Sequence, residues 1–414
     1  MLAFEDAQLR LLALGEALEP RPTEDCPIDD ALGRTLAADV CARDDIPGFD
    51  GSTMDGYALL ASSLGADGGT LPLAHESRAG HVAPAFVPGS TMRIFTGAPL
   101  PEGADAVIMQ ERVTVETTES GKLVRFSGGT AAGNNVRKRG ADLRAGDVAL
   151  ARGARLGPAA LALAASCDHA RVTVTRKPRV ALLLTGDELR PPGIPGRPGQ
   201  LPESNGAAIA AMVANAGGEI VSKETLVDDL AEVTRALERA FETAELVLTV
   251  GGVSVGDHDV VRDALVAAGA SLDFWRVAIK PGKPLAVGTR ARADRTSLFL
   301  GLPGNPASAM VTFGLFGVPL LRKLCGASAP LPVPTSVVVG HAVKHEPGRT
   351  ELVRAVVEPR EEGLPMARAV SHQASGAGIG MVLANALLLV PRESEGLEAG
   401  ARALAYPFSE IGLR

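Results

Sequence analysis

The sequence predicts a multidomain chain of α/β and β structure, in which a doubly wound α/β domain carries the functional site. Between residues 178 and 326, short apolar runs alternate with helical segments, as in a doubly wound α/β fold. Short alternating apolar runs on both sides of this region favour additional β domains. The length of 414 residues, with 46% hydrophobic residues, also suggests about two to four domains.

The α/β region is predicted from its order of strands and helices. Strands are expected at 180–184, 220–227 and 246–250, followed by two further strands that include 274–279 and 298–300. Helices are expected from Ser204 or Asn205 to Gly217, at 229–243, at 257–268 up to Gly269, and across 307–324 with an internal Pro319.

The flanking regions predict less regular structure. Residues 2–18 have helical periodicity, and 158–167 predict a helix with proline in its first turn. Short β runs are expected at 92–95, 106–109 and 113–115, and again at 336–339, 351–357 and 386–390. The last three favour a separate C-terminal β barrel or sandwich.

Composition excludes several classes of protein. A net charge of −7 argues against a nucleic-acid-binding surface. The four cysteines have no zinc-ligand spacing and are expected to be reduced core residues. No apolar stretch reaches about 18 residues, so no membrane span is expected. The first ten residues include Glu5 and Asp6 and lack a basic segment, so we expect no signal peptide and a cytoplasmic protein.

Three loops rich in glycine and proline carry the strongest functional signal. They span residues 251–259, 280–284 and 301–306, and each follows a short apolar run expected to form a buried parallel strand. Ligands of open α/β sheets bind at the carboxyl ends of parallel strands. The three loops are therefore expected to converge on one site.

The residues of these loops suit an anionic ligand. Glycine allows backbone N–H groups to approach an anion closely, and lysines held in a proline-stiffened loop attract phosphate or another oxyanion. The first loop lacks the spacing of a P-loop, and the domain's first strand carries no Rossmann fingerprint. The candidate substrate-binding residues are Gly252, Ser254, Gly256, Lys280, Lys283, Pro303, Asn305 and Pro306.

Three carboxylates follow strands of the α/β domain and should share its ligand edge. They are Glu188, Asp228 and Asp259. Carboxylates beside an anion site are typical of a hard cation, so we expect these three to bind Mg²⁺. The histidines form no metal motif, His258 is expected to cap a helix, and no Ser-His-Asp arrangement or single general base is evident.

These motifs resemble one known family along essentially the whole chain. The matching segments are 47–58 (PGFDGSTMDGYA), 93–101 (RIFTGAPLP), 184–189 (LTGDEL) and the three loops, with Arg137, Gly140 and Asp142 in a further block. The chain resembles the MoeA family of molybdopterin molybdenumtransferases, which is related to the gephyrin E domain.

The resemblance implies a particular domain organisation. It implies an elongated linking domain made of 1–45 and 141–177, whose first helix can pack on the catalytic domain, and an inserted β-rich domain at 46–140. The α/β molybdopterin-binding catalytic domain would then cover 178–326, and a C-terminal β barrel 327–414.

The resemblance also implies a reaction and its residues. The family inserts molybdenum from molybdate into adenylylated molybdopterin with Mg²⁺ and releases AMP. It works as a homodimer, and a molybdopterin adenylyltransferase supplies its substrate. The catalytic residues implied by motif position are Asp55, Thr96, Asp142, Glu188, Asp228 and Asp259, of which Asp55 and Thr96 would come from the partner chain.

Some residues depart from the family pattern. Gly51, Ala141, Glu203 and Val250 stand where Asn, Glu, Asp and Ser or Thr are usual. The alternative functions are those of a paralogue that prefers tungstate, a non-enzymatic gephyrin-like scaffold, and a related pterin or nucleotide enzyme. The intact acidic and lysine positions favour an enzyme. The segment Met54 to Tyr57 and the C-terminal β region argue against the third.

Overall fold

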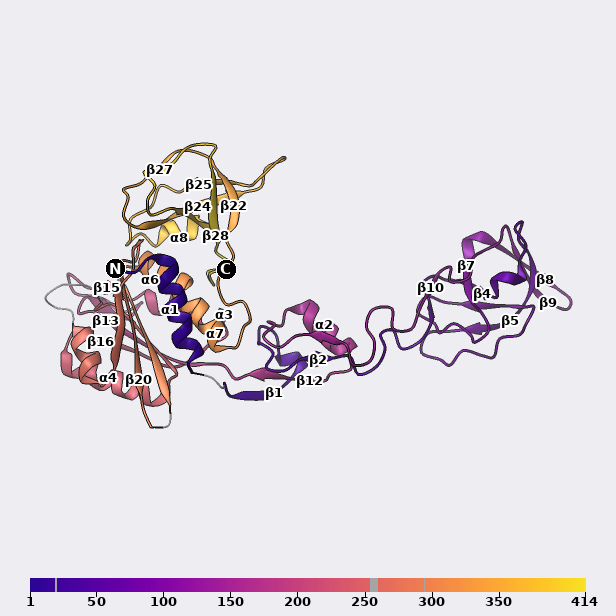
Figure 1. Ribbon diagram of the computed structural model, residues 1–414, viewed down its shortest axis with the longest axis horizontal. Coiled ribbons are helices and arrows are strands. Elements are labelled where there is room, and N and C mark those ends of the chain that lie inside the picture. Colours follow the sequence, from indigo (N-terminus) through magenta and orange to yellow (C-terminus); the bar gives the residue numbers. More distant parts are fainter. Residues whose placement is uncertain (19–20, 254–259, 294) are drawn as a thin grey trace.

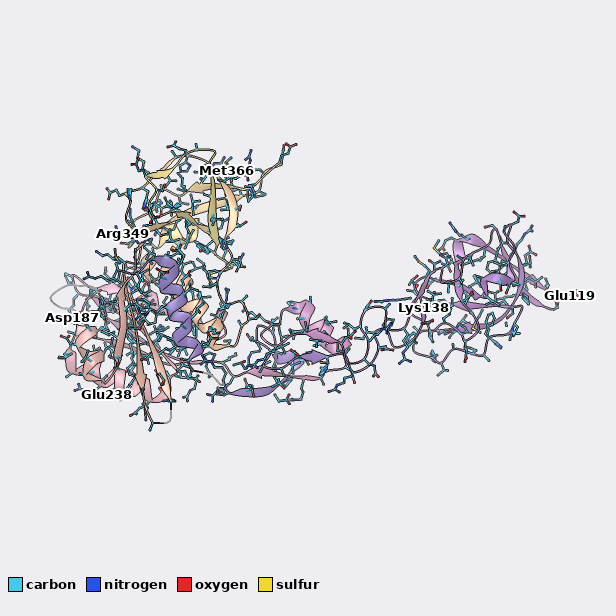
Figure 2. All side chains as sticks on the ribbon, viewed as in Figure 1. Glu119, Lys138, Asp187, Glu238, Arg349 and Met366 are labelled. Atoms are coloured by element: carbon cyan, nitrogen blue, oxygen red, sulfur yellow. The ribbon has the colours of Figure 1, made fainter. Side chains whose placement is uncertain are left out.

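The chain forms an elongated molecule with its domains strung along one axis. The computed structural model describes residues 1–18, 21–253, 260–293 and 295–414. An α/β domain and a β barrel lie together at one end, and a β-rich domain lies at the other end beyond a slender linking domain (Figure 1). Figure 2 shows the same separation, with Asp187 at one end and Glu119 at the opposite tip.

A mixed six-stranded sheet forms the centre of the α/β domain. Its strand order is β16-β13-β17-β21-β20-β18, and the first four strands are parallel. The bounds are β13 Arg179–Thr185, β16 Glu219–Leu226, β17 Leu246–Val250, β18 Ser271–Arg276, β20 Pro284–Ala291 and β21 Thr296–Leu302.

Helices cover both faces of this sheet, because successive strand residues point to opposite sides. Val180, Leu182 and Leu184 pack into one core with α1, α3, α6 and α7, whereas Ala181 and Leu183 pack into a second core with α4 and α5. The helices are α1 Phe4–Glu16, α3 Asn205–Asn215, α4 Leu230–Thr243, α5 Val260–Ala267, α6 Pro306–Thr312 and α7 Val318–Leu324. The predicted doubly wound architecture is confirmed.

The prediction of a buried parallel strand at 274–279 was wrong. Strand β18 ends at Arg276, lies at the sheet edge and pairs antiparallel with β20. Residues Ile279–Lys280 form a separate short strand, β19, which pairs with the C-terminal barrel. An apolar run does not indicate strand direction, which depends on pairing with residues distant in sequence.

The expected long helix at 307–324 is interrupted. Helix α6 passes through a π-helical segment, Phe313–Gly317, into α7, where Pro319 occupies the first turn. The stretch Pro306–Leu324 has 19 residues and is apolar enough to match a membrane span, so the expectation that no apolar stretch reaches about 18 residues was wrong. Within the protein, 83% of this stretch is buried, as in the central helix of a folded domain.

The linking domain consists of two short antiparallel ribbons around a small core. Strand β1 (Thr23–Pro27) pairs with β12 (Arg171–Thr175), and β2 (Val40–Cys41) pairs with β11 (Val148–Leu150). Helix α2 (Pro158–Ser166) covers the core, which includes Cys26 and Cys167. All four cysteines are free. Helix α1 packs instead on the α/β domain, where the Gln8 amide donates to the Leu315 carbonyl at 2.7 Å.

The inserted domain is a six-stranded sheet of order β7-β4-β6-β5-β9-β8. The pair β3 (Gly51–Ser52) and β10 (Val136–Arg137) joins this sheet to the linking domain. The sheet strands are β4 Gly56–Leu59, β5 Gly69–Ser77, β6 Thr91–Ile94, β7 Ala106–Met109, β8 Val113–Thr118 and β9 Gly121–Phe126.

The C-terminal domain is a closed five-stranded barrel, which decides between the barrel and the sandwich left open by the sequence. Its order is β24-β25-β22-β28-β26, and β26 pairs back to β24. The strands are β22 Thr335–Val339, β24 Thr350–Glu358, β25 Met366–Ala369, β26 Ala386–Val390 and β28 Arg402–Pro407. A small ribbon of β23 (Val343–Lys344) and β27 (Gly396–Leu397) and the short helix α8 (Ile379–Leu383) complete it.

Candidate functional site

A pocket of about 440 Å³ opens at the carboxyl ends of the parallel strands β13, β17 and β21. The ends of these strands and the first turns of α3 and α6 surround it. Gly252, Pro303, Asn305 and Pro306, all expected as binding residues, line it together with Glu188 and Asp228. The first and third glycine-proline loops thus converge as the parallel-strand argument predicted.

The glycines of the first loop allow the backbone to lie very close to Thr185. Gly251 and Gly252 have φ angles of +97° and +61°. A Cβ on Gly251 would lie 2.3 Å from the Thr185 carbonyl oxygen, and one on Gly252 would lie 3.0 Å from the Thr185 hydroxyl. That hydroxyl lines the pocket and is buried, with no hydrogen-bond partner among the described residues. A buried, unpartnered polar group at a pocket wall favours a ligand that would satisfy it.

We expect Gly251→Ala to destabilise the α/β domain by about 3 kcal/mol, because strain at positive φ adds to a steric clash. Gly269→Ala is a matched control, because its φ is +75° and a Cβ there meets nothing within 4 Å. That change should cost only about 1 kcal/mol. Urea unfolding followed by the fluorescence of Trp275, the sole tryptophan, measures both variants. Equal losses would contradict the clash.

A small ribbon holds two carboxylates at the pocket edge. Strand β14 (Leu189–Arg190) pairs with β15 (Leu201–Pro202), and Leu201 N donates to the Glu188 carbonyl at 2.7 Å. This pairing brings Glu188 and Glu203 to the same pocket. Glu203 is buried, its Oε1 accepts from Gly206 N at 2.7 Å, and its Oε2 lies 3.8 Å from Lys223 Nζ. Glu203, rather than Ser204, therefore caps α3.

Two asparagines tie the third loop to its neighbours. Asn205 Nδ2 donates to the Gly304 carbonyl at 2.8 Å, while its Oδ1 is buried and has no partner in the described part of the chain. Asn305 Nδ2 donates to Ser375 Oγ at 3.2 Å, and Ala307 N donates to the Ser375 carbonyl at 3.1 Å. The pocket is thereby connected to the C-terminal barrel through Ser375.

The two candidate lysines differ in their electrostatic surroundings. Lys280 Nζ lies 3.0 Å from Glu351 Oε1 of the barrel, and the other Glu351 oxygen lies 2.7 Å from Nδ1 of the buried His345. Lys283 has no ion-pair partner within the described residues, and it directly precedes Pro284, which lines the pocket. Because β20 is antiparallel, its first residue lies at the same edge as the end of β21. The second loop thus reaches the site from the start of a strand, not from the end of one.

Arg354 is a buried cation that the sequence patterns did not single out. Its side chain lies in β24, and its Nη2 donates to the Ala374 carbonyl at 3.2 Å. Its Nε and Nη1 are buried without partners, and burial lowers the pKa of the guanidinium. The segment that contains Ala374 continues to Ser375, which contacts Asn305 of the pocket, so Arg354 is connected to the pocket through this segment.

Three predicted residues lie far from this pocket in the same chain. Asp55 Oδ1 accepts from Thr96 N at 2.8 Å and Thr96 Oγ1 at 2.9 Å, and these bonds, the backbone one first, lower the pKa of Asp55. Asp142 pairs with Arg137 and raises the pKa of that arginine. Strand β4, which follows Asp55, and strand β13 lie at opposite ends of the molecule in Figure 1. Ser254, Gly256, His258 and Asp259 lie outside the described residues.

The sequence patterns did not indicate Thr185, Asn205 or Arg354 as site residues. They indicated Glu203 only as a departure from the family pattern. An arginine within the apolar run 351–357 was a usable signal, since a charged residue inside a buried strand requires a partner or a ligand. The contributions of Thr185 and Asn205 depend on contacts between separate loops. Among the described residues, no cluster of three or more His, Cys, Asp or Glu side chains could hold a metal ion alone.

The fold and the pocket define a multidomain α/β protein with a pocket at the carboxyl edge of its parallel strands. Three successive stretches match families described as MoeA N-terminal region (domain I and II) at 2–167, probable molybdopterin binding domain at 181–323, and MoeA C-terminal region (domain IV) at 336–408. The chain belongs to the MoeA family of molybdopterin molybdenumtransferases, which are transferases of molybdenum cofactor biosynthesis.

Relatives from distant organisms support this assignment. A molybdopterin molybdenumtransferase of Haemophilus influenzae is 36% identical over 99% of this chain and 100% of its own length. One of Bacillus subtilis is 33% identical over 91% of this chain and 88% of its own length. The crystal structure of a molybdopterin biosynthesis MoeA protein of Pyrococcus horikoshii has 28% identity and a TM-score of 0.81, and covers 98% of this chain and 100% of that one.

Proposed function

We propose that this chain inserts molybdenum from molybdate into adenylylated molybdopterin and releases AMP. The observation that carries the proposal is the pocket of about 440 Å³, which combines glycine-lined backbone, carboxylates and the N-terminal turns of two helices. A pocket of this volume suits an organic ligand, and the positive end of the α3 helix dipole suits its phosphates. The unpartnered Thr185 hydroxyl and Asn205 amide oxygen supply a donor and an acceptor for the same ligand.

The residues of the pocket fit Mg²⁺. Glu188, Asp228 and the Thr185 hydroxyl offer hard oxygen ligands, and Mg²⁺ is usually held by one or two carboxylates together with substrate phosphates and water. When bound, Mg²⁺ would neutralise charge on the pyrophosphate. The chain itself would then position the substrate along the strand ends, and Lys283 would attract the oxyanion towards it.

The remaining proposed residues require a second subunit. Asp55, Thr96 and Asp142 lie in or beside the inserted domain, far from the α/β pocket of their own chain. We propose a homodimer in which the inserted domain of one subunit faces the α/β pocket of the other. The enzyme would work in the cytoplasm and receive its substrate from a molybdopterin adenylyltransferase.

The test is AMP release from adenylylated molybdopterin by the purified chain. Release should require both molybdate and Mg²⁺ and should stop when a chelator is added. Tungstate should be offered in parallel, since molybdate and tungstate have the same charge and nearly the same size. AMP release that is unaffected by the chelator would overturn the role of Mg²⁺, and no release with either oxyanion would overturn the proposed reaction.

The surroundings of the two lysines predict unequal roles. We expect Lys283→Met to weaken molybdate binding about tenfold or more, as for the loss of one charge-assisted contact. Lys280→Met should weaken it only a few-fold, because Glu351 already compensates that charge. The KM for molybdate in the AMP-release assay measures both changes.

The double variant Lys280→Met/Glu351→Gln provides the control for this comparison. It removes the ion pair as a unit, so it should bind molybdate like wild type if the two charges cancel. A larger effect of Lys280→Met than of Lys283→Met would contradict the assignment.

A further inference from the structure

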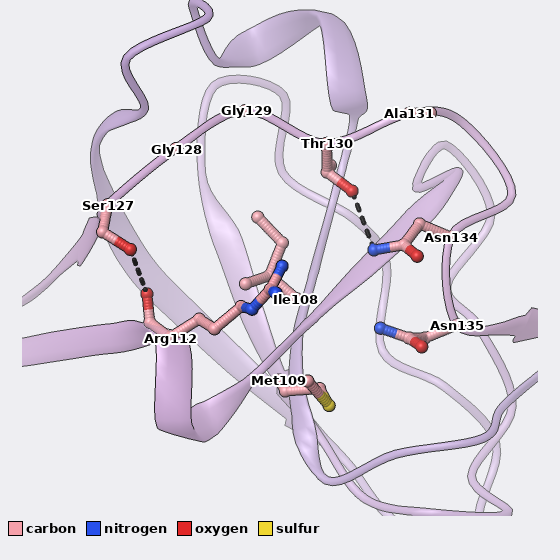
Figure 3. A pocket seen from close by; sticks show the side chains of 10 residues that line it. All are labelled: Ile108, Met109, Arg112, Ser127, Gly128, Gly129, Thr130, Ala131, Asn134 and Asn135. Carbon is pink, nitrogen blue, oxygen red and sulfur yellow. Dashed lines mark hydrogen bonds between the residues drawn. The ribbon is translucent and has the colours of Figure 1, made fainter.

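A second cavity, of about 420 Å³, lies in the inserted domain, remote from the α/β pocket of the same chain. Its wall is formed by the end of β7, the following 3₁₀ turn (Gln110–Arg112) and the segment 127–135 (Figure 3). Its volume is close to that of the α/β pocket and lies in the range of small-molecule sites. None of the proposed site residues lines this cavity.

The wall of the cavity is fixed by contacts behind it. Gly129 N donates to the Ala66 carbonyl at 3.1 Å, and Gly133 N donates to the Asp105 carbonyl at 2.7 Å. A Cβ on Gly129 would lie 2.8 Å from the Gly65 carbonyl oxygen, so this backbone is packed as closely as its glycine allows. Segment 127–135 is therefore a built wall that is anchored to the rest of the domain.

Arg112 places an uncompensated cation in this cavity. Its side chain extends from the 3₁₀ turn towards Ile108 at the centre of the view in Figure 3. Its guanidinium has no hydrogen bond or ion pair to any other described residue. By contrast, Arg78 and Arg137 of the same domain are each paired with a carboxylate. No carboxylate lines the cavity.

The other polar groups add both donors and acceptors. Asn134 Nδ2 donates to Thr130 Oγ1 at 3.0 Å, which leaves the hydrogen of that hydroxyl available for a ligand. Asn135 Nδ2 donates one hydrogen to the Val107 carbonyl at 2.9 Å and keeps a second. Ile108 and Met109 supply an apolar surface beside these donors. Arg112, with the Thr130 hydroxyl and the second Asn135 amide hydrogen, suits an anionic oxygen group, and the size of the cavity leaves room for an organic part.

We propose that this cavity binds a small organic phosphate, with Arg112 as the counter-ion of the phosphate group. The guanidinium fork matches phosphate geometry, and the Thr130 hydroxyl adds a further donor. The apolar side at Ile108 and Met109 receives the organic part. This site does not depend on the proposed reaction.

A light-activated azido derivative of AMP tests the site on the full-length chain, with labelled peptides located by mass spectrometry. Label is expected on peptides from 108–135, and Arg112→Gln should reduce it about tenfold, as for one lost charge-assisted contact. Arg112→Lys should retain part of it. Arg125→Gln is the matched control, because Arg125 is an exposed arginine of the neighbouring β9 that does not line the cavity.

Competing ligands test the role of Arg112 and the role of the organic part separately. Unlabelled AMP should displace the label more effectively than inorganic phosphate, and adenosine should displace it least. Equal competition by adenosine would overturn the role of Arg112, and equal competition by inorganic phosphate would overturn the organic part. Labelling confined to the α/β loops, or lost equally in Arg125→Gln, would overturn the site itself. A chain that labels here but releases no AMP would contradict only the proposed reaction.

Discussion

Replacing Glu188 by Gln or Asp228 by Asn should lower the rate of AMP release by about 10² to 10³-fold, as for the loss of one positioned charge in an active site. Both side chains line the pocket, and each substitution keeps the shape while removing the charge. The rate constant at saturating substrate measures the change. Thermal unfolding should be nearly unchanged, because Glu188 is exposed and Asp228 is only partly buried.

Glu224→Gln is the control for this pair. Glu224 lies on β16 of the same domain, pairs with Arg239 at 2.7 Å and does not line the pocket. Its loss should leave the rate within about twofold of wild type, since an exposed ion pair contributes little. Near-normal rates for both pocket variants would mean that these carboxylates do not serve the reaction.

Mixing an inactive Asp55→Asn chain with an inactive Asp228→Asn chain should restore activity. If Asp55 serves the α/β pocket of the other subunit, one site of each mixed dimer receives both defects and the other receives neither. Random exchange makes about half of the dimers mixed, so activity should approach about a quarter of wild type. The AMP-release assay measures this recovery after subunit exchange.

Dilution provides the control for complementation. Recovery should disappear below the dissociation constant of the dimer and return on concentration. A mixture of Asp228→Asn with Glu188→Gln should stay inactive, because both defects lie in the same domain and every site keeps one of them. If the first mixture also stays inactive after exchange is confirmed by mass, Asp55 does not serve the partner's pocket.

Much of the α/β domain could be predicted from the sequence, because its signals are local. Apolar runs such as 180–184 and 246–250, followed closely by glycine, specify buried strands. The helix expected at 229–243 is present as α4, and the side chain of Asp229 caps it. The carboxyl ends of parallel strands meet at one edge, so the convergence of Gly252 and Pro303 followed from order along the chain. Whole-chain motif order also sufficed to indicate the MoeA family.

Other features were decided only by tertiary structure. The apolar run at 274–279 gave no information on strand direction, which the pairing of β18 with β20 determines. Lys280 and Lys283 look equivalent in sequence, yet Glu351, 71 positions after Lys280, compensates only the first of them. Strand pairing and charge compensation both depend on residues that are distant in the sequence, and local periodicity carries no information about those residues.

The sequence by itself therefore determined the family, the doubly wound domain and the edge of the sheet where the site lies. Within the described residues, the tertiary structure decided which groups at that edge have no partner, such as Lys283 and the Thr185 hydroxyl, and it brought Arg354 to the segment that holds Ser375. It also formed the Arg112 cavity from two segments with no motif of their own. The physical reason is that charge compensation and burial depend on the whole set of neighbours in space, which only the folded chain brings together.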